Sequence, residues 1–233
     1  DTPRCKGGIR SVYNNYACTI NGKHTYYYYG LYVTNTAPIA PPEVKTQYIE
    51  VPGRNGNLDL TDALTGRPVY GDRKITLEMG GKKPAGEWPG FFSRFLADVH
   101  GKKVEIVFDN VPGCYYVGRA IVSGAYERGN EIARFTVTVT AEPYKYARFN
   151  TLPPVTATAA GISQRLVGSD YLTVPEFTVT GGPVTLKVGD NSYTLQTGTT
   201  KNYEIMIDNR AYVYTYVGTG TETVQVSYKR GWL

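Results

Sequence analysis

The sequence predicts a mainly β protein with a single α-helix, and three observations support this fold class. Tyr, Thr and Val favour a pleated, half-buried surface, and Tyr alone accounts for 21 of the 233 residues. Several short runs alternate between apolar and polar side chains, as strands with one buried face do. Only one run places apolar residues at helical spacing. Abundant glycine and proline supply the turns between these elements.

Charge and composition divide the chain into two parts. Residues 1–149 contain 19 Lys or Arg against 14 Asp or Glu, whereas residues 150–233 contain six of each. Between them, TLPPVTATAAG (151–161) has neither charge nor amphipathic period, as is typical of a linker. We therefore predict two domains, 1–149 and 150–233, with the boundary near 148–160.

The first domain is predicted to be a β-sandwich or barrel-like sheet with one helix. Its clearest strand is ARFTVTVTA (133–141), because Phe135 and Val137 fall on one face and Arg134 and Thr136 on the other. The further predicted strands span 24–34, 45–51, 73–79, 103–109 and 114–124. GGKKPAGE (80–87) lacks the G-K-[ST] of a phosphate-binding loop and is interpreted as a solvated hairpin tip.

The single helix is predicted over about 88–100, within WPGFFSRFLADVHG. One face carries Phe91, Phe92, Phe95, Leu96 and Val99 and is expected to pack on the sheet, while Arg94 and Asp98 point away. His100 precedes Gly101 and is expected at the helix C-terminus, where a cation is favourable.

The second domain is predicted to be a small β-sandwich. Short strands alternate with Gly- and Asn-rich turns at the spacing that such folds show. The predicted strands span 172–180, 183–188, 192–197, 203–208, 211–217 and 223–228.

Motifs for catalysis or metal binding are absent from the sequence. His24 and His100 are the only histidines, and no zinc, triad or phosphate-loop pattern occurs. Asp59 and Asp62 form a carboxylate pair, which we interpret as turn chemistry and not as a glycosidase site. We therefore expect no catalytic residue, cofactor or metal. No apolar run approaches the roughly 18 residues of a membrane span, so no membrane insertion is expected.

The three cysteines, Cys5, Cys18 and Cys114, are widely spaced and form no C-x-x-C pair. Three free thiols in a reducing compartment are the first expectation, with a Cys5–Cys18 disulfide as the alternative.

Tyrosine clusters leave several binding functions open. Alternate tyrosines of a strand point to opposite faces, so the run Tyr26 to Tyr29 is not expected to form one stacking surface. Protein interfaces or core are favoured over carbohydrate binding, and nucleic-acid binding is the least favoured because basic residues form no run beyond pairs.

Five segments, taken together and in order, resemble the distal tail (Dit) family of long non-contractile phage tails. They are QYIEVPGRNGNLDLTDALTGRPVYGDRKITLEM (47–79), FLADVHGKKVEIVFD (95–109), YYVGRA (115–120), FTVTVTAEPYKY (135–146) and VQVSYKRGWL (224–233). The resemblance covers the chain nearly end to end. It implies an N-terminal domain that assembles six copies into a ring and a C-terminal galectin-like β-sandwich.

The same resemblance implies a structural virion protein and not an enzyme. Its expected location is the phage tail tip, after synthesis in the bacterial host cytoplasm. Its expected partners are five further copies of itself, the tail tube protein, a tail-tip protein and a receptor-binding protein. DNA would pass through the ring without specific binding. Because a basic lumen would hold the phosphates, we expect the lumen to be neutral or acidic.

Candidate contact residues follow from these two functional hypotheses. For a ring or partner interface we expect contacts from Tyr26, Tyr28, Pro41, Pro42, Tyr48, Arg54 and Asn55. Gly53 and Gly56 flank the last two and are expected to adopt turn dihedrals. The alternative hypothesis is a carbohydrate-binding module for host cell-wall saccharide, with contacts from Tyr212, Tyr214 and Tyr216.

Overall fold

The computed structural model describes residues 17–35, 37 and 39–233, which form two compact units. The described part of the first unit runs from residue 17 to Lys145, and the second runs from Tyr146 to Trp232. The mainly β fold class with one helix is confirmed.

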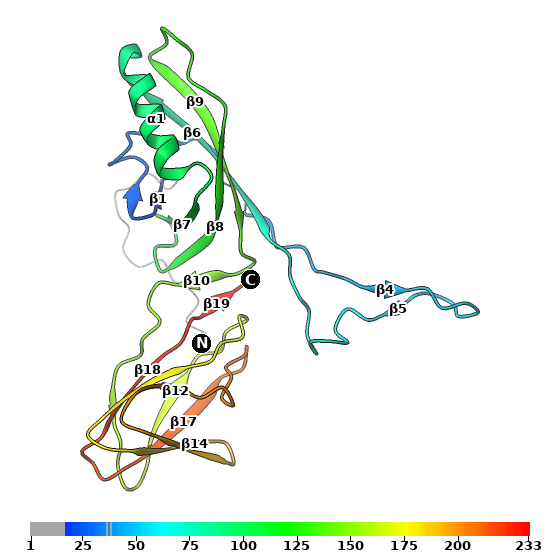
Figure 1. The fold of residues 1–233 in the computed structure, drawn as a ribbon, viewed down its shortest axis with the longest axis vertical. Coiled ribbons are helices and arrows are strands. Elements are labelled where there is room, and N and C mark those ends of the chain that lie inside the picture. The colour runs from blue at the N-terminus through cyan, green and yellow to red at the C-terminus, as the bar shows by residue number, and fades with distance from the viewer. Residues whose placement is uncertain (1–16, 36, 38) are drawn as a thin grey trace. The chain divides into compact units, whose positions relative to one another are not determined.

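The first unit is built on one antiparallel sheet with strand order β2-β1-β7-β8-β9-β6-β3 (Figure 1). Its strands are β1 (Cys18–Ile20), β2 (Lys23–His24), β3 (Tyr32–Val33), β6 (Arg73–Lys82), β7 (Lys103–Phe108), β8 (Cys114–Ser123) and β9 (Ile132–Ala141). Strand β6 pairs with β9 along its whole length, from Arg73 opposite Ala141 to Lys82 opposite Ile132. The predicted alternation holds over 73–79 of β6 and over all of β9, because every second side chain is buried there.

This sheet is strongly curled. Strands β2 and β3 lie at opposite ends of the strand order, which at about 4.8 Å per strand corresponds to about 29 Å along the sheet. Only residues 25–31 connect them, and part of this segment is a tight turn. So short a link cannot span a flat sheet of that width. The two edges must therefore approach each other around the core.

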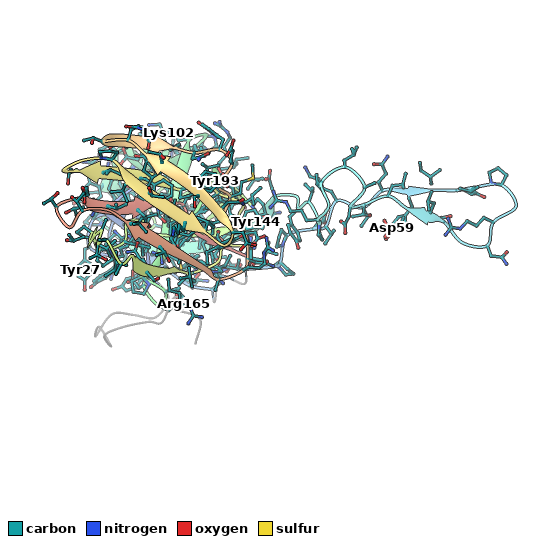
Figure 2. All side chains as sticks on the ribbon, turned by 90° about the horizontal axis from the view of Figure 1, so that it is seen from below. Tyr27, Asp59, Lys102, Tyr144, Arg165 and Tyr193 are labelled. Carbon is teal, nitrogen blue, oxygen red and sulfur yellow. The ribbon has the colours of Figure 1, made fainter. Side chains whose placement is uncertain are left out.

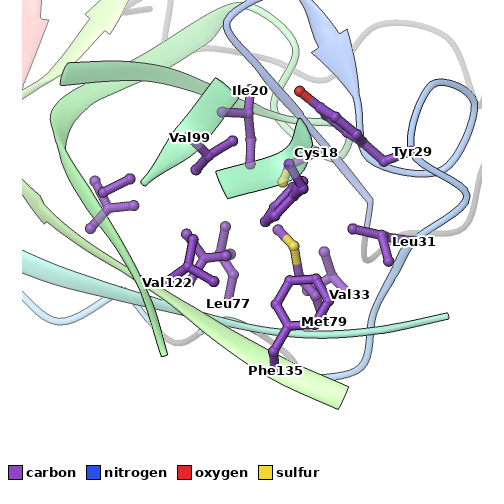
Figure 3. Close-up of a cluster of buried hydrophobic side chains, with 14 of the residues drawn as sticks. Cys18, Ile20, Tyr29, Leu31, Val33, Leu77, Met79, Val99, Val122 and Phe135 are labelled. Atoms are coloured by element: carbon purple, nitrogen blue, oxygen red, sulfur yellow. The ribbon is translucent and has the colours of Figure 1, made fainter. Parts of the chain in front are cut away.

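Helix α1 (Trp88–Val99) closes this core, as predicted for the 88–100 run. The buried side chains of Phe91, Phe95 and Val99 join the apolar face of the sheet in one cluster, and Phe92 and Leu96 pack against it partly buried. Figure 3 shows Val99 in this cluster with Leu77, Val122 and Phe135 of the sheet. The rings of Phe95 and Phe135 lie 5.3 Å apart, a favourable aromatic separation. The packing of the apolar helix stripe against the sheet is confirmed.

Two sequence-based expectations around this helix need correction. Residues 80–87 do not form a hairpin tip: Gly80–Lys82 complete β6, and a 3₁₀ turn, Ala85–Glu87, leads into the helix. His100 does lie at the helix C-terminus, but its Nδ1 accepts a hydrogen bond from the Val122 amide at 3.0 Å. This nitrogen therefore acts as an acceptor and not as part of a cation.

The cysteines also differ from the first expectation. Cys114 is disulfide-bonded, and Cys18 is a buried free thiol whose pKa burial raises to about 12. Three free thiols and a Cys5–Cys18 bridge are therefore both wrong, and Cys5 itself lies outside the described residues. The sequence could not reveal this, because disulfide formation depends on the distance between Cα atoms in the fold.

The second unit contains two four-stranded antiparallel sheets that share one apolar core. The first sheet has the order β11 (Val155–Thr156), β18 (Thr223–Ser227), β13 (Glu176–Thr180) and β16 (Gly198–Lys201). The second has the order β12 (Ile162–Leu166), β17 (Tyr212–Val217), β14 (Val184–Val188) and β15 (Asn191–Leu195). Near the chain end, β10 (Lys145–Ala147) pairs with β19 (Gly231–Trp232).

The prediction of a strand over 203–208 is wrong. Its edge position is taken by β16, whose partner is Glu176–Val179 of β13. Within the predicted range only Ile207 forms a β-bridge, with Thr173. Strand β16 is a polar GTTK segment with every residue exposed, so it carries no apolar alternation that sequence reasoning could detect.

A buried carboxylate orders the turn between β17 and β18. Glu222 accepts hydrogen bonds from the Thr219 amide at 2.8 Å, the Thr219 hydroxyl at 2.6 Å and the Gly220 amide at 3.2 Å. These donors, above all Thr219, stabilise the ionised form and lower the pKa of Glu222 from 4.5 to about 2.

Glu222→Gln is therefore expected to remove a pH-dependent part of the stability. A lowered folded-state pKa contributes stability above pH 4.5, and this is lost as the pH falls towards 2. Urea unfolding of both proteins between pH 7 and 2.5 should show a higher unfolding free energy for the wild type at neutral pH. The difference in unfolding free energy between the two proteins should become smaller as the pH falls. A difference in unfolding free energy that stays constant with pH would contradict this role for Glu222.

Candidate assembly interface

A long exposed arm, residues 40–72, separates β3 from β6 within the first unit (Figures 1 and 2). Its strands β4 (Tyr48–Ile49) and β5 (Leu58–Asp59) form a two-stranded sheet of their own. The predicted strand over 45–51 is therefore reduced to two residues. A lone two-stranded hairpin is at best marginally stable in water, so these two short strands contribute little stability by themselves.

Two pairings set the direction of the arm. Ile39 forms a β-bridge with Ile75 of β6, and Val44 forms one with Tyr70. The amide of Lys45 also donates to the Val69 carbonyl at 2.8 Å. The chain thus continues along the line of β6 and leaves the sheet beyond its Arg73 end.

Most predicted interface residues of the arm are exposed. Pro41, Arg54 and Asn55 are exposed, as is Tyr48 at 55%. Pro42 is the exception: it is buried, so its predicted role as a partner contact is wrong. Sequence reasoning could not separate two adjacent prolines, because their burial depends on how the arm root packs.

The backbone at the arm tip adopts the turn dihedrals that its glycines predict. Gly53 and Gly56 have φ angles of 82° and 76°, in the left-handed region. The amide of Arg54 donates to the Val51 carbonyl at 3.1 Å, which closes the first part of the turn. The expectation of turn dihedrals on either side of Arg54 and Asn55 is confirmed.

The second predicted interface segment, Tyr26 to Tyr29, is not the strand that its composition indicates. It forms a compact helical turn, in which the Tyr28 amide donates to His24 O at 3.0 Å and the Gly30 amide to Tyr26 O at 2.8 Å. We call residues 25–30 the Tyr turn. It exposes Tyr26 at 42% and Tyr28 at 62% and buries Tyr29. The argument that alternation prevents a common aromatic surface therefore does not hold.

His24 determines this conformation. Its Nδ1 accepts hydrogen bonds from the amides of Tyr26 at 3.1 Å and Tyr27 at 3.2 Å, as an N-cap side chain does. Its Nε2 lies 2.9 Å from Asp109 Oδ2. The Nε2–H tautomer satisfies all three contacts. The controlling partner, Asp109, is 85 residues away in sequence, so local propensity could not reveal the turn.

We expect His24→Ala to loosen the Tyr turn. Loss of an N-cap acceptor costs about 0.5–2 kcal/mol, and here it leaves two amides without their acceptor. Hydrogen exchange of the 25–31 segment should become faster in His24→Ala and stay near wild type in His24→Asn, which keeps a capping acceptor. Equal protection in all three proteins would contradict the capping role.

A cavity of about 350 Å³ lies between the Tyr turn and α1. We call it the notch. Its aromatic part comes from Tyr29, Phe91 and Phe95, and Lys23 and Arg94 supply positive charge. Asp98 accepts from Lys23 Nζ at 2.7 Å and from the Tyr29 hydroxyl at 3.0 Å. These two hydrogen bonds lower the pKa of Asp98 and keep it ionised.

The sequence contained one signal for the notch. Arg94 and Asp98 are four residues apart on the outer face of the predicted helix, so they were expected on one solvent-facing stripe. Lys23 and Tyr29 gave no such signal, because the Tyr turn brings them to the helix through contacts distant in sequence.

The tyrosines predicted to contact saccharide do not form a binding surface. Tyr214 and Tyr216 have no exposed area and lie in the core of the second unit, so the prediction is wrong for both. Their places in β17 alternate with Val213 and Thr215, which is the inward side of the strand. Tyr212 is partly buried, and its hydroxyl donates to Asp208 Oδ1 at 2.9 Å.

A matched pair of core tyrosines offers a test of this packing. Within the described residues, the buried Tyr214 hydroxyl has no hydrogen-bond partner, whereas the Tyr228 hydroxyl contacts the Val167 amide and carbonyl, both at 3.0 Å. Tyr214→Phe is expected to be neutral or to stabilise the unit by about 1 kcal/mol. Tyr228→Phe is expected to destabilise it by about 1–3 kcal/mol. Urea unfolding measures both, and the reverse order would contradict the packing.

The carboxylate pair noted in the sequence, Asp59 and Asp62, lies on the arm. Asp59 is on the arm, where its Oδ1 accepts from the Thr61 amide at 2.9 Å, which agrees with its interpretation as a turn residue. In residues 17–35, 37 and 39–233 there is no group of three or more His, Cys, Asp or Glu side chains able to hold a metal ion. Over the same residues, no helix has the length and apolarity to cross a membrane.

Comparisons with known proteins relate this chain to others through structure and not through sequence. No family model matches it, and no curated protein matches it significantly. Among solved structures, it is similar to the SPP1 Dit protein, described as a paradigm of hub adsorption apparatus in phages that infect Gram-positive bacteria. The TM-score is 0.63 at 13% identity, and the likeness covers 93% of this chain and 99% of the SPP1 chain. The resemblance to the distal tail family is thereby confirmed at the level of the fold: this chain has a Dit-like fold.

Proposed function

We propose that this protein is a structural hub at the distal end of a long non-contractile phage tail. Six copies would form a ring that joins the tail tube protein to tail-tip and receptor-binding proteins and leaves a channel for DNA. The protein would act in the virion, after synthesis in the bacterial cytoplasm, and would not be an enzyme.

The observation that carries this proposal is the extent of the structural likeness. It includes nearly all of this chain and nearly all of a phage hub protein, so it is not limited to one widespread sandwich domain. A shared β-sandwich alone would say little about function, since such folds serve many roles.

The exposed arm and the Tyr turn support ring assembly on separate grounds. Each contact in a cyclic ring is heterologous and therefore needs two different surfaces on every subunit. The arm offers one surface, with Tyr48 at 55% and Leu64 at 94% exposed. The Tyr turn offers another, with exposed tyrosines of the kind that is enriched in interfaces.

Native mass spectrometry of the purified full chain tests the assembly. We expect a species of six times the 25.7 kDa of one chain, populated increasingly as the concentration rises. A persistent monomer, or a closed dimer with no larger species, would contradict the proposal.

A further inference from the structure

An ordered turn on the arm presents the most exposed large apolar side chain of the described residues. Leu64 is 94% exposed. The turn that carries it, residues 59–66, is held by hydrogen bonds from the Gly66 amide to Asp62 O at 2.7 Å and from the Ala63 amide to Leu60 O at 3.1 Å. A leucine held in water by an ordered turn is well placed to enter an apolar site on another molecule.

The charge of this turn is complementary to that of the notch. Between residues 59 and 66 the only charged side chains are Asp59 and Asp62. The notch combines the exposed ring of Tyr28 and the largely buried rings of Tyr29 and Phe91 with an exposed Arg94. Its carboxylate, Asp98, is already paired with Lys23 at 2.7 Å, so Arg94 is the notch cation that faces an acidic partner. Its volume of about 350 Å³ is at the lower end of ligand-sized pockets, which suits one apolar side chain and its flanking residues.

One chain cannot bring these two features together by itself. The Tyr turn lies at the Gly81 end of β6, where a Cβ on Gly81 would meet Gly30 O at 3.0 Å. The arm leaves at the Arg73 end, about 26 Å away at 3.3 Å per residue. The bridges Ile39–Ile75 and Val44–Tyr70 direct the arm away from that end (Figure 1).

We infer that turn 59–66 of one copy of this chain docks into the notch of a neighbouring copy. Leu64 contacts the aromatic side of the notch, and Asp62 faces Arg94. This inference rests on the proposed ring, and it specifies which two surfaces form each contact. Because the two surfaces differ, the contact repeats head to tail and can close a ring.

Site-specific photo-crosslinking tests the contact directly. The full chain carries p-benzoylphenylalanine in place of Leu64, is assembled and irradiated, and the products are mapped by mass spectrometry. We expect crosslinks between chains that end in residues 23–29 or 91–98. The same probe in place of Ile132, which is 59% exposed in the same unit, is the control and should give no crosslinks between chains to these segments.

A charge reversal tests the ion pair. Asp62→Arg and Arg94→Glu should each raise the concentration at half-assembly by about tenfold, because each places like charges opposite one another. The double variant should return towards wild type, and Asp62→Asn should have the smaller effect of a lost attraction. If the double variant assembles more weakly than either single variant, Asp62 and Arg94 do not pair and the inference is wrong.

The outcomes separate this inference from the proposed function. If rings form but the Leu64 probe crosslinks only to other segments, the docking inference is wrong and the hub proposal stands. If the wild-type chain forms no ring, both are wrong.

Discussion

Removing the outer arm is expected to abolish ring assembly and leave both units folded. Residues 45–69 include no buried residue, and Val44 and Tyr70 already pair as a β-bridge at the arm root. An Asn-Gly turn can therefore join these two residues in place of the deleted segment. Native mass spectrometry should shift from six chains to one, with unfolding free energy within about 0.5 kcal/mol of wild type.

A substitution on the second unit provides the control for this deletion. Val213 is 56% exposed, so Val213→Ser should leave the assembly intact. Rings that persist without the arm would contradict its role as an assembly surface. If the deletion variant fails to fold, the arm is not independent of the core.

Phe95→Ala is expected to have the largest effect on stability in the first unit. Phe95 has no exposed area, and its ring lies 5.1 Å from that of Tyr29 and 5.3 Å from that of Phe135. Truncation of a buried Phe costs about 3–5 kcal/mol, a large share of the 5–15 kcal/mol by which domains are usually stable.

Trp88 offers a local reporter for this measurement, because it is fully buried in the same unit. In a Trp232→Phe background, urea unfolding followed by tryptophan fluorescence reports only this unit. Ile132→Ala is the matched control, since Ile132 lies in the same unit, is 59% exposed and should change the unfolding free energy by no more than about 0.5 kcal/mol. Equal effects of the two variants would contradict the assignment of Phe95 to the core.

The sequence predicted the elements whose signal is local. Strand β9 alternates over ten residues, β6 alternates over the seven residues 73–79, and α1 has a clear apolar stripe, so periodicity alone placed them nearly at their observed bounds. The positive φ angles of Gly53 and Gly56 also follow from the residue type.

The errors arose where distant contacts override local preference. The run Tyr26 to Tyr29 has strand composition, but the hydrogen bonds of His24 impose a turn on it. Tyr214 and Tyr216 were predicted to stack on sugar but are buried, because a single sequence does not show which side of a strand the second sheet covers. The exposed Leu64 and the notch could be recognised only from the fold, because the notch joins residues distant in sequence.

Negative-stain electron microscopy of the purified full chain is the most direct test of the central claim, that this Dit-like fold forms a tail hub. We expect class averages of rings with six-fold symmetry and a central opening, and loss of these rings when residues 45–69 are removed. Rings of another symmetry, particles without an opening, or monomers at every concentration would contradict the hub.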